Sequence, residues 1–385
     1  MRIEILSNLE CMHKVLPAWQ DLFENATLQR PTSTPEYCLT WFKHFGSGSK
    51  SQWETKTAKK HADSVNLLYL LWEGNQLNAA LPLILNRRKR FGVRFNNLTG
   101  LENQHNPGDS SLLIRQGKEL MSQRIFKAAL DDHRWDKASI GYLPPEEACL
   151  REFIQANQLL GNWAANIDSI DTSVLFYEGT FQEFLAQDKS RQKLVTHSRS
   201  YLERKYGEIS VDCFSDNASP DAGFDLFVEV DAKSWKASAP GGEALAQHPK
   251  IESYYRELFE RYHHNHRSKI WILRINNRPA AVRLCCEVGG MIYGFKTSFS
   301  TEFRQTSASR PGFVLDSFIL ERSWHRSIGF DFVHPKYADI WKIPSGKLVK
   351  HEFINNNPRS QALAICDKGV KRLLKRLKPS KPPKP

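Results

Sequence analysis

A polar loop that leads into an apolar helix is the first stretch of this sequence whose residues could do chemistry. Residues 294–312 read GFKTSFSTEFRQTSASRPG, and residues 313–327 are apolar at helical spacing. The first N–H groups of a helix have no intrahelical acceptor and lie at the positive end of its dipole, so they can bind an anion such as a diphosphate. The residues that could contribute to such a site are Lys296, Arg304, Ser309, Arg310, Pro311 and Gly312.

The last two of these residues allow two interpretations. Pro311 suits a first helical turn because it has no N–H to leave unsatisfied, and Gly312 lets a ligand approach the backbone closely. A Pro-Gly pair also marks an ordinary helix start. The residues alone therefore leave open whether this junction is a plain turn or an anion-binding cradle.

Three side chains near this junction could move a proton. Asp331 and His334 end an expected strand with the sequence GFDFVH, and Glu302 lies in the polar loop. Any of them could act as a general base if it reached the proton of an acceptor group. Asp331 could equally brace its strand, and His334, which precedes a proline, suits a turn.

Several classes of function lack their sequence signals. His263, His264 and His266 lie close together, but no H-E-x-x-H motif or acidic partner accompanies them, so we expect no metal site. Neither a P-loop motif nor a G-x-G-x-x-G motif occurs, and this argues against a nucleoside triphosphatase and a Rossmann enzyme.

The formal net charge of +12 over 385 residues is concentrated at the C-terminus. Seven cations fall in VKRLLKRLKPSKPPKP, which has no acidic residue. We expect a disordered basic tail over residues 367–385, which could contact an anionic membrane surface weakly, and no specific nucleic-acid binding. The seven scattered cysteines, and the lack of a signal peptide or an apolar run of membrane-spanning length, predict a cytoplasmic protein.

The order of expected elements occurs twice along the chain. Each half reads as helices, an antiparallel meander, a helix and a strand, which predicts a duplicated α/β fold. In the second half, residues 180–207 read as one long helix, and residues 269–299 as three strands with turns at 276–277 and 289–290. We expect domains at residues 1–172 and 173–366, followed by the tail.

Five motifs in the second half carry a family resemblance. They are DKSRQKLVTHSRSYLERKYG, SWK, NNRPAAVRL, IYGFKTSFSTEFRQTSASRPG and FDFVHPKYADIWK. In this order they resemble the acetyltransferases of the cellulose-biosynthesis type, a branch of the GNAT superfamily of acyl-CoA N-acyltransferases. The first half resembles the degenerate first copy found in double-domain relatives, including the Fem-like peptidoglycan aminoacyl transferases.

The resemblance implies both a fold and a function. The fold would be two tandem GNAT-like domains with mixed, largely antiparallel sheets flanked by helices. The second domain would bind acetyl-CoA or another acyl-CoA, with its pyrophosphate at the loop, and transfer the acyl group to an amine or hydroxyl. The acceptor would be a sugar, a polysaccharide precursor or another cell-envelope metabolite. Residues implied to contact this acceptor are Arg191, Trp235, Lys236, Trp341 and Lys342.

Two alternatives remain at this point. A Fem-like transferase would take its acyl group from aminoacyl-tRNA, bound by the basic residues of helix 180–207. These residues are Lys189, Arg191, Lys193, Arg199, Arg204 and Lys205. A catalytically silent copy would instead serve as a scaffold in polysaccharide or envelope assembly.

Overall fold

The fold is described from a computed structural model of the chain. The described residues are 1–46, 63–90, 93–101, 112–131, 134–215, 219–239, 244–306 and 308–366. The basic tail expected at residues 367–385 lies outside these ranges. Within them, no helix is both long and apolar enough to cross a lipid bilayer.

The chain forms two compact units, and each takes segments from both ends of the sequence. Unit 1 contains Met1–Thr27, Phe45–Ser169 and the described residues from Val349 onward, and unit 2 contains Leu28–His44 and Ile170–Leu348. The domain boundaries expected from the sequence, at residues 172 and 366, assume that each domain is one continuous segment. They stay a prediction.

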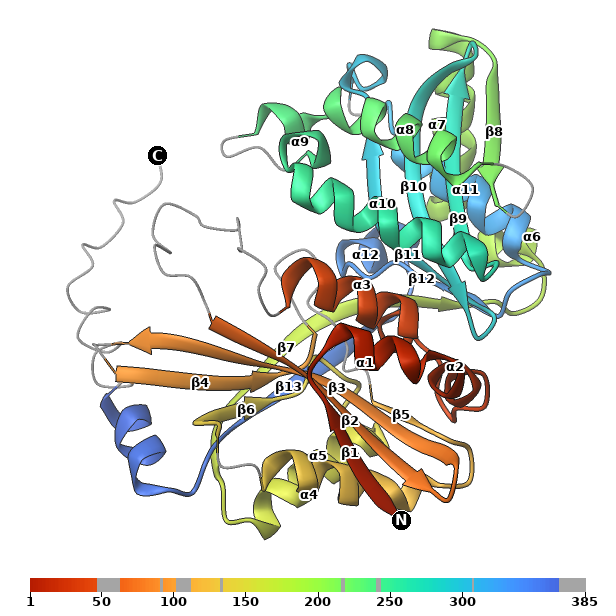
Figure 1. The fold of residues 1–385 in the computed structure, drawn as a ribbon. Helices are drawn as coiled ribbons and strands as arrows, with labels where there is room; N and C mark the ends of the chain where they lie inside the picture. Colours follow the sequence, from red (N-terminus) through yellow and green to blue (C-terminus); the bar gives the residue numbers. More distant parts are fainter. Residues whose placement is uncertain are drawn as a thin grey trace. The chain divides into compact units, whose positions relative to one another are not determined.

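The sheet of unit 1 has the strand order β1-β2-β3-β4-β6-β13, with β5 beside β3. Neighbouring strands are antiparallel except for β4 and β6, which are parallel. The strands are β1 (Arg2–Leu6), β2 (Asp63–Glu73), β3 (Gln76–Arg90), β4 (Val93–Thr99), β5 (Leu113–Ile114), β6 (Lys137–Ser139) and β13 (Ser345–Ile354). Helices α1 (Leu9–Lys14) and α2 (Leu16–Glu24) cover one face, and α4 (Ser122–Leu130) and α5 (Ala148–Leu159) cover the other (Figure 1).

The sheet of unit 2 has the strand order β8-β9-β10-β11-β12-β7. Its strands are β8 (Ile209–Phe214), β9 (Ser268–Ile275), β10 (Arg278–Val288), β11 (Met291–Phe299), β12 (Gly329–Asp331) and β7 (Trp163–Phe176). All neighbours are antiparallel except β11 and β12. Both units therefore share one ladder pattern, which confirms the duplicated α/β fold expected from the repeated element order. The final strand of each unit comes from the other half of the sequence.

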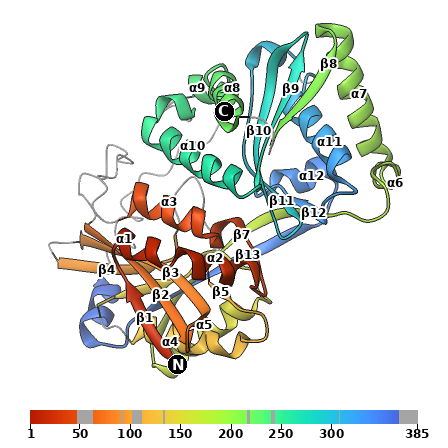
Figure 2. The same cartoon turned by 45° about the vertical axis from the view of Figure 1, so that its right-hand side comes forward.

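Helices flank both faces of the sheet in unit 2. Figure 2 shows α8 and α10 on one face and α7 and α11 on the other. The helices are α3 (Pro35–Phe45), α6 (Phe181–Ala186), α7 (Lys189–Tyr206), α8 (Pro220–Ala232), α9 (Trp235–Ser238), α10 (Pro249–His264), α11 (Pro311–Ser323) and α12 (Lys336–Trp341). The face under α7 and α11 carries an aromatic-rich core that includes Phe313, Trp324 and Trp341.

Turn and helix-capping residues explain where the expected strands and helices of unit 2 begin and end. Asn276, Asn277, Gly289 and Gly290 all have positive φ, as the two-residue hairpin turns between β9, β10 and β11 require. The single helix expected over residues 180–207 is wrong. It breaks into α6 and α7 because the side chain of Asp188 accepts a hydrogen bond from the N–H of Arg191 at 2.8 Å and so begins a new helix.

Candidate functional site

Strands β11 and β12 separate within unit 2. Their parallel pairing covers Met291–Gly329, Ile292–Phe330 and Tyr293–Asp331, and β12 ends at Asp331 while β11 continues to Phe299. The register between β11 and β10 also shifts next to Gly294, where Phe295 is the extra residue of a β-bulge. We call the end of the pairing, at Tyr293 and Asp331, the branch point.

The bulge changes the direction in which side chains of β11 point. Phe295 contacts the rings of Phe259 and Tyr262 on α10, and Lys296 places its Nζ 5.2 Å from the ring centroid of Tyr255 on the same helix. Two successive side chains therefore face α10, where a regular strand would alternate. The side chain of Lys296 therefore projects from β11 towards α10, at a position between the branch point and the far end of the strand.

The far end of β11 meets the start of α11. A Cβ atom on Gly312 would lie 3.3 Å from Cδ1 of Phe299, the last residue of the strand. From the branch point to Phe299 the strand covers about 20 Å. The segment of β11 from Tyr293 to Phe299 therefore leads from the branch point to the helix start.

The loop before α11 is held by its own hydrogen bonds. The buried Ser309 donates its hydroxyl to the carbonyl oxygen of Phe303, and its N–H bonds to the carbonyl oxygen of Thr306 at 3.1 Å. Thr306 also bonds to the hydroxyl of Tyr201 on α7 at 2.9 Å. Ser309 therefore shapes the loop, and its hydroxyl is used inside it.

The cations at this end lie where an anion could reach them. Arg304 and Arg310 are exposed, and the guanidinium of Arg304 lies 4.9 Å from the ring centroid of Phe299. Arg310 immediately precedes α11, Pro311 is its first residue, and the half-buried Gly312 its second. The structure thus brings Arg304, Arg310 and the free N–H groups of the first helical turn to one end of β11.

Asp331 lies at the branch point, where its carboxylate holds a strained turn. Its Oδ1 accepts a hydrogen bond from the N–H of Val333 at 2.7 Å. Val333 has φ +60°, a conformation that costs a β-branched residue energy and has to be held by its surroundings. This observation favours the role of Asp331 as a brace of the turn, and its part in proton transfer stays a prediction.

His334 is exposed and hydrogen-bonded to backbone. Its Nδ1 accepts from the N–H of Lys336 at 3.2 Å, so the neutral ring carries its proton on Nε2. Although the residue is exposed, loss of water around part of its ring, together with the nearby charge of Lys336, lowers the pKa of His334 below its usual 6.5. At neutral pH this side chain is therefore a hydrogen-bond donor, which does not favour the general base that we expected.

Glu302 lies at the other end of β11 from Asp331. It is exposed and forms an ion pair with Arg278 at 2.5 Å. Its place near the end of β11, in the short 3-10 helix Thr301–Phe303, separates it from the branch point. The structure therefore does not bring Glu302 together with Asp331 and His334.

Two of the residues expected to contact the acceptor lie in the core instead. Arg191 is 3% exposed and donates to the carbonyl oxygens of Trp341, at 2.9 Å, and Phe184. Trp341 is fully buried, with its ring centroid 4.7 Å from that of Phe313. Both side chains join α6, α7, α11 and α12, so the acceptor contact expected of them is not favoured by the structure.

The other three expected contacts are on the surface or near it. Trp235 is 47% exposed and Lys342 is exposed. Lys236 donates to the carbonyl oxygen of Thr297 at 2.6 Å and lies 3.5 Å from the buried carboxylate of Asp231. Lys236 therefore fastens α9 to the end of β11, and Trp235 beside it is placed at the surface.

A buried ion pair was missed by our sequence analysis. Arg283 on β10 and Asp316 on α11 are joined at 2.5 Å, and each side chain is 2% exposed. The signal was a lone arginine inside the apolar run PAAVRLCC and a lone aspartate inside the apolar run FVLDSFIL. Neither residue type is normally buried unless it is paired.

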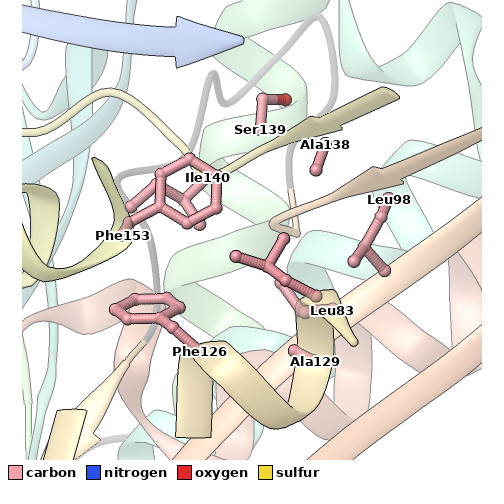
Figure 3. A pocket seen from close by; sticks show the side chains of 9 residues that line it. Leu83, Leu98, Phe126, Ala129, Ala138, Ser139, Ile140 and Phe153 are labelled. Carbon is pink, nitrogen blue, oxygen red and sulfur yellow. The ribbon is translucent and has the colours of Figure 1, made fainter. Parts of the chain in front are cut away.

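The corresponding position in unit 1 has a different geometry. There the parallel pairing of β4 with β6 extends to Thr99, the last residue of β4. Beside it lies a small apolar cavity of about 10 Å³ (Figure 3). It is lined by Leu83, Leu98, Phe126, Ala129, Leu130, Ala138, Ser139, Ile140 and Phe153. This space holds one water at most, so it is no binding site for a cofactor.

Metal ligands are a separate question. In the part of the chain that the structure describes, no group of three or more His, Cys, Asp or Glu side chains could hold a metal ion.

Comparison with known proteins points to the same segment as this geometry. Residues 188–342 match the model of the family described as acetyltransferase (GNAT) domain. The matched segment contains β11, the loop, α11 and β12. No curated protein matches the sequence.

Several solved structures resemble the chain in fold. FemX has a TM-score of 0.58 at 10% identity, over 94% of this chain and 100% of that one. A conserved protein of unknown function from Bacteroides thetaiotaomicron VPI-5482 has a TM-score of 0.51 at 9% identity, over 92% and 100%. A tandem GNAT protein from the clavulanic acid biosynthesis pathway has a TM-score of 0.46 at 11% identity, over 92% and 99%.

The cellulose-biosynthesis type stays a prediction, because none of these comparisons tests it. The mixed α/β fold, with helices on both faces of each sheet, agrees with the fold class expected from the sequence. The comparisons thus show a likeness of residues 188–342 to the GNAT acetyltransferase domain, within a chain of mixed α/β fold.

Proposed function

We propose that the protein is an acyl-CoA-dependent N- or O-acyltransferase whose donor site runs along β11 in unit 2. The observation that carries this proposal is the separation of β11 from β12, which leaves one edge of β11 leading to the start of α11. The match of residues 188–342 to an acetyltransferase domain supports it. The length of this edge, about 20 Å, is comparable with the length of an extended pantetheine arm.

The residues at the two ends of β11 fit the two ends of such a donor. Arg304, Arg310 and the first N–H groups of α11 suit a diphosphate, because they combine positive charge with N–H groups that have no intrahelical acceptor. The loop is already shaped by the buried Ser309, so an anion would bind without much ordering cost. At the branch point, backbone N–H groups of β11 that lack a β12 partner can polarise a carbonyl.

Each residue near the branch point then has a defined task. A bound acyl-CoA would supply an activated thioester carbonyl. Backbone N–H groups after Tyr293 would orient and polarise that carbonyl, the carboxylate of Asp331 would take the proton of the acceptor amine or hydroxyl, and coenzyme A would leave as its thiolate. The Nε2–H of His334 can donate a further hydrogen bond. In this proposal, most of the rate enhancement comes from positioning the acceptor and polarising the thioester carbonyl.

The acceptor that we propose is a sugar, a polysaccharide precursor or another cell-envelope metabolite. This part of the proposal rests on the motif resemblance. Trp235 supports it, because an exposed indole is a common surface for stacking a sugar ring or another apolar face. Exposed aromatic side chains elsewhere in the chain have the same property, so a glycan screen has to identify the acceptor.

Thermal unfolding with and without ligand tests the donor. Coenzyme A, acetyl-CoA and dephospho-CoA should each raise the Tm of the wild type by mass action. The variant Arg304→Ala/Arg310→Ala should lose most of this shift, while Arg326→Ala, which removes an exposed cation just beyond the other end of α11, should keep it. No shift with any of the three ligands at millimolar concentration would overturn the proposal.

A Fem-like transfer from aminoacyl-tRNA is the second candidate, and the fold likeness to FemX over that whole chain favours it. Its expected basic surface on α7 is reduced, because Arg191 is buried and Arg199 pairs with Glu321 at 2.8 Å. Lys189, Lys193, Arg204 and Lys205 remain exposed. Binding of tRNA that weakens steeply with salt, together with no binding of coenzyme A, would support this candidate over the first.

A further inference from the structure

The buried pair of Arg283 and Asp316 lies directly beneath the branch point. A Cβ atom on Gly294, the residue that follows the last β11–β12 pair, would lie 2.3 Å from Nη2 and 2.6 Å from Nε of Arg283. The guanidinium carbon is 4.9 Å from the ring centroid of Phe330 and 5.4 Å from that of Phe332. The cation therefore fills the core side of the point where the strands separate.

Stability does not explain why a charged pair occupies this place. Removing two charges from water costs so much that well-packed apolar residues of similar volume are often as stable or more stable. The pair is also incompletely satisfied, since Nε of Arg283 has no hydrogen-bond partner among the described residues. A requirement of the neighbouring site is a better explanation for its presence.

We infer that the Arg283–Asp316 pair is the specificity-determining wall that limits the donor to short acyl groups. The inference rests on the proposed function, which places the thioester carbonyl along β11 just after Tyr293. An acyl chain directed from there into the core meets the guanidinium behind Gly294, where the backbone has no room for even one carbon atom. The buried rings of Phe330 and Phe332 and the half-buried ring of Tyr337 close the space around it.

A long alkyl chain would have to displace this pair. The guanidinium cannot move to water without leaving Asp316 as a buried unpaired charge, and an apolar chain offers it no new partner. An acetyl or propionyl group is much shorter and would need less space at this obstacle. Chain length, and not the affinity for the coenzyme A portion, is therefore the property that the pair controls.

Titration calorimetry with coenzyme A, acetyl-CoA and octanoyl-CoA tests this inference by binding alone. The wild type should bind coenzyme A and acetyl-CoA with similar affinity and octanoyl-CoA about tenfold more weakly. In Arg283→Leu/Asp316→Ala, which removes both charges together and opens the space, octanoyl-CoA should bind within about threefold of acetyl-CoA. The affinity for free coenzyme A should stay close to that of the wild type.

A matched control removes another ion pair that includes a residue of β10, the strand that carries Arg283. Lys269 and Glu287 are joined at 3.0 Å and each side chain is 24% exposed, so Lys269→Leu/Glu287→Ala should leave the chain-length preference unchanged. If Arg283→Leu/Asp316→Ala does not fold, the smaller opening in Arg283→Met/Asp316→Val should shift the preference in the same direction by about threefold.

The outcomes separate the inference from the proposed function. Equal binding of octanoyl-CoA and acetyl-CoA by the wild type would overturn the inference alone. A folded pair variant that keeps the wild-type preference would do the same. If the wild type binds none of the three ligands, the proposed function fails and the inference fails with it.

Discussion

At the scale of single residues, the charged side chains inside apolar segments proved the most informative. Arg283 and Asp316 are each the only charged residue in an apolar run, PAAVRLCC and FVLDSFIL, and the structure buries them against each other. Arg191 shows the opposite error, because its place in a basic helix suggested a surface role while its guanidinium lies over the ring of Phe184 at 3.6 Å. Charge type alone cannot tell whether a side chain on a helix faces solvent or core, since that depends on packing partners far along the chain.

Asp331 allows a test that separates its two roles. Asp331→Asn keeps the oxygen that accepts from the N–H of Val333 but removes the carboxylate, so the Tm should hold while acyl transfer falls by about 100-fold. Asp331→Ala should lower both. The rate is measured as release of free thiol from acetyl-CoA with water or an added amine as acceptor.

The control for this test is Asp339→Asn, which changes an exposed carboxylate on α12. It should leave both the Tm and the rate unchanged. A wild-type rate in Asp331→Asn would mean that Asp331 only braces the strand, and the proton would then have to leave by another route.

At the scale of elements, local signals identified most strands and helices, but they did not show to which of the two units each element belongs. Turn residues with positive φ located the meander of β9, β10 and β11 correctly. The segment Leu28–His44, by contrast, reads as part of the first half but packs in unit 2. Long-range ion pairs hold it there, such as Glu36 with Arg267 at 2.7 Å, and no local pattern in the sequence reveals them.

A second long-range contact predicts a pH effect on stability. Burial alone would raise the pKa of Glu257 on α10, but hydrogen bonds from Lys43, His44 and Arg261 lower it to about 2. Because the folded pKa is below the ordinary 4.5, this contact contributes stability above pH 4.5 and loses it as the pH falls towards 2. Glu257→Gln should therefore lower the Tm at pH 7 by about 2–4 °C, and the difference from the wild type should shrink in acid.

Thermal unfolding between pH 7 and pH 3 checks this effect. The matched control is Glu229→Gln on α8, which breaks an exposed pair with Lys233 at the end of that helix and should change the Tm very little at any pH. A Tm difference for Glu257→Gln that stays constant down to pH 3 would contradict the assignment of its lowered pKa.

At the scale of the whole molecule, the two units have the same pattern of strand pairing. They differ in how far their parallel pair of strands stays paired. Element order in the sequence predicted the duplication, because each unit repeats the same local elements. It could not show that β4 stays paired with β6 to its end while β11 continues past β12, since this depends on where a bulge shifts the register. That detail assigns the proposed donor site to unit 2.

Hydrogen–deuterium exchange with and without coenzyme A tests the central claim most directly, because it locates the ligand without any substitution. Saturating coenzyme A should slow exchange in residues 308–316 and 294–299, at the start of α11 and along β11, and leave β4 and β6 of unit 1 unchanged. Protection confined to unit 1, or no protection at a concentration that saturates binding, would contradict the account.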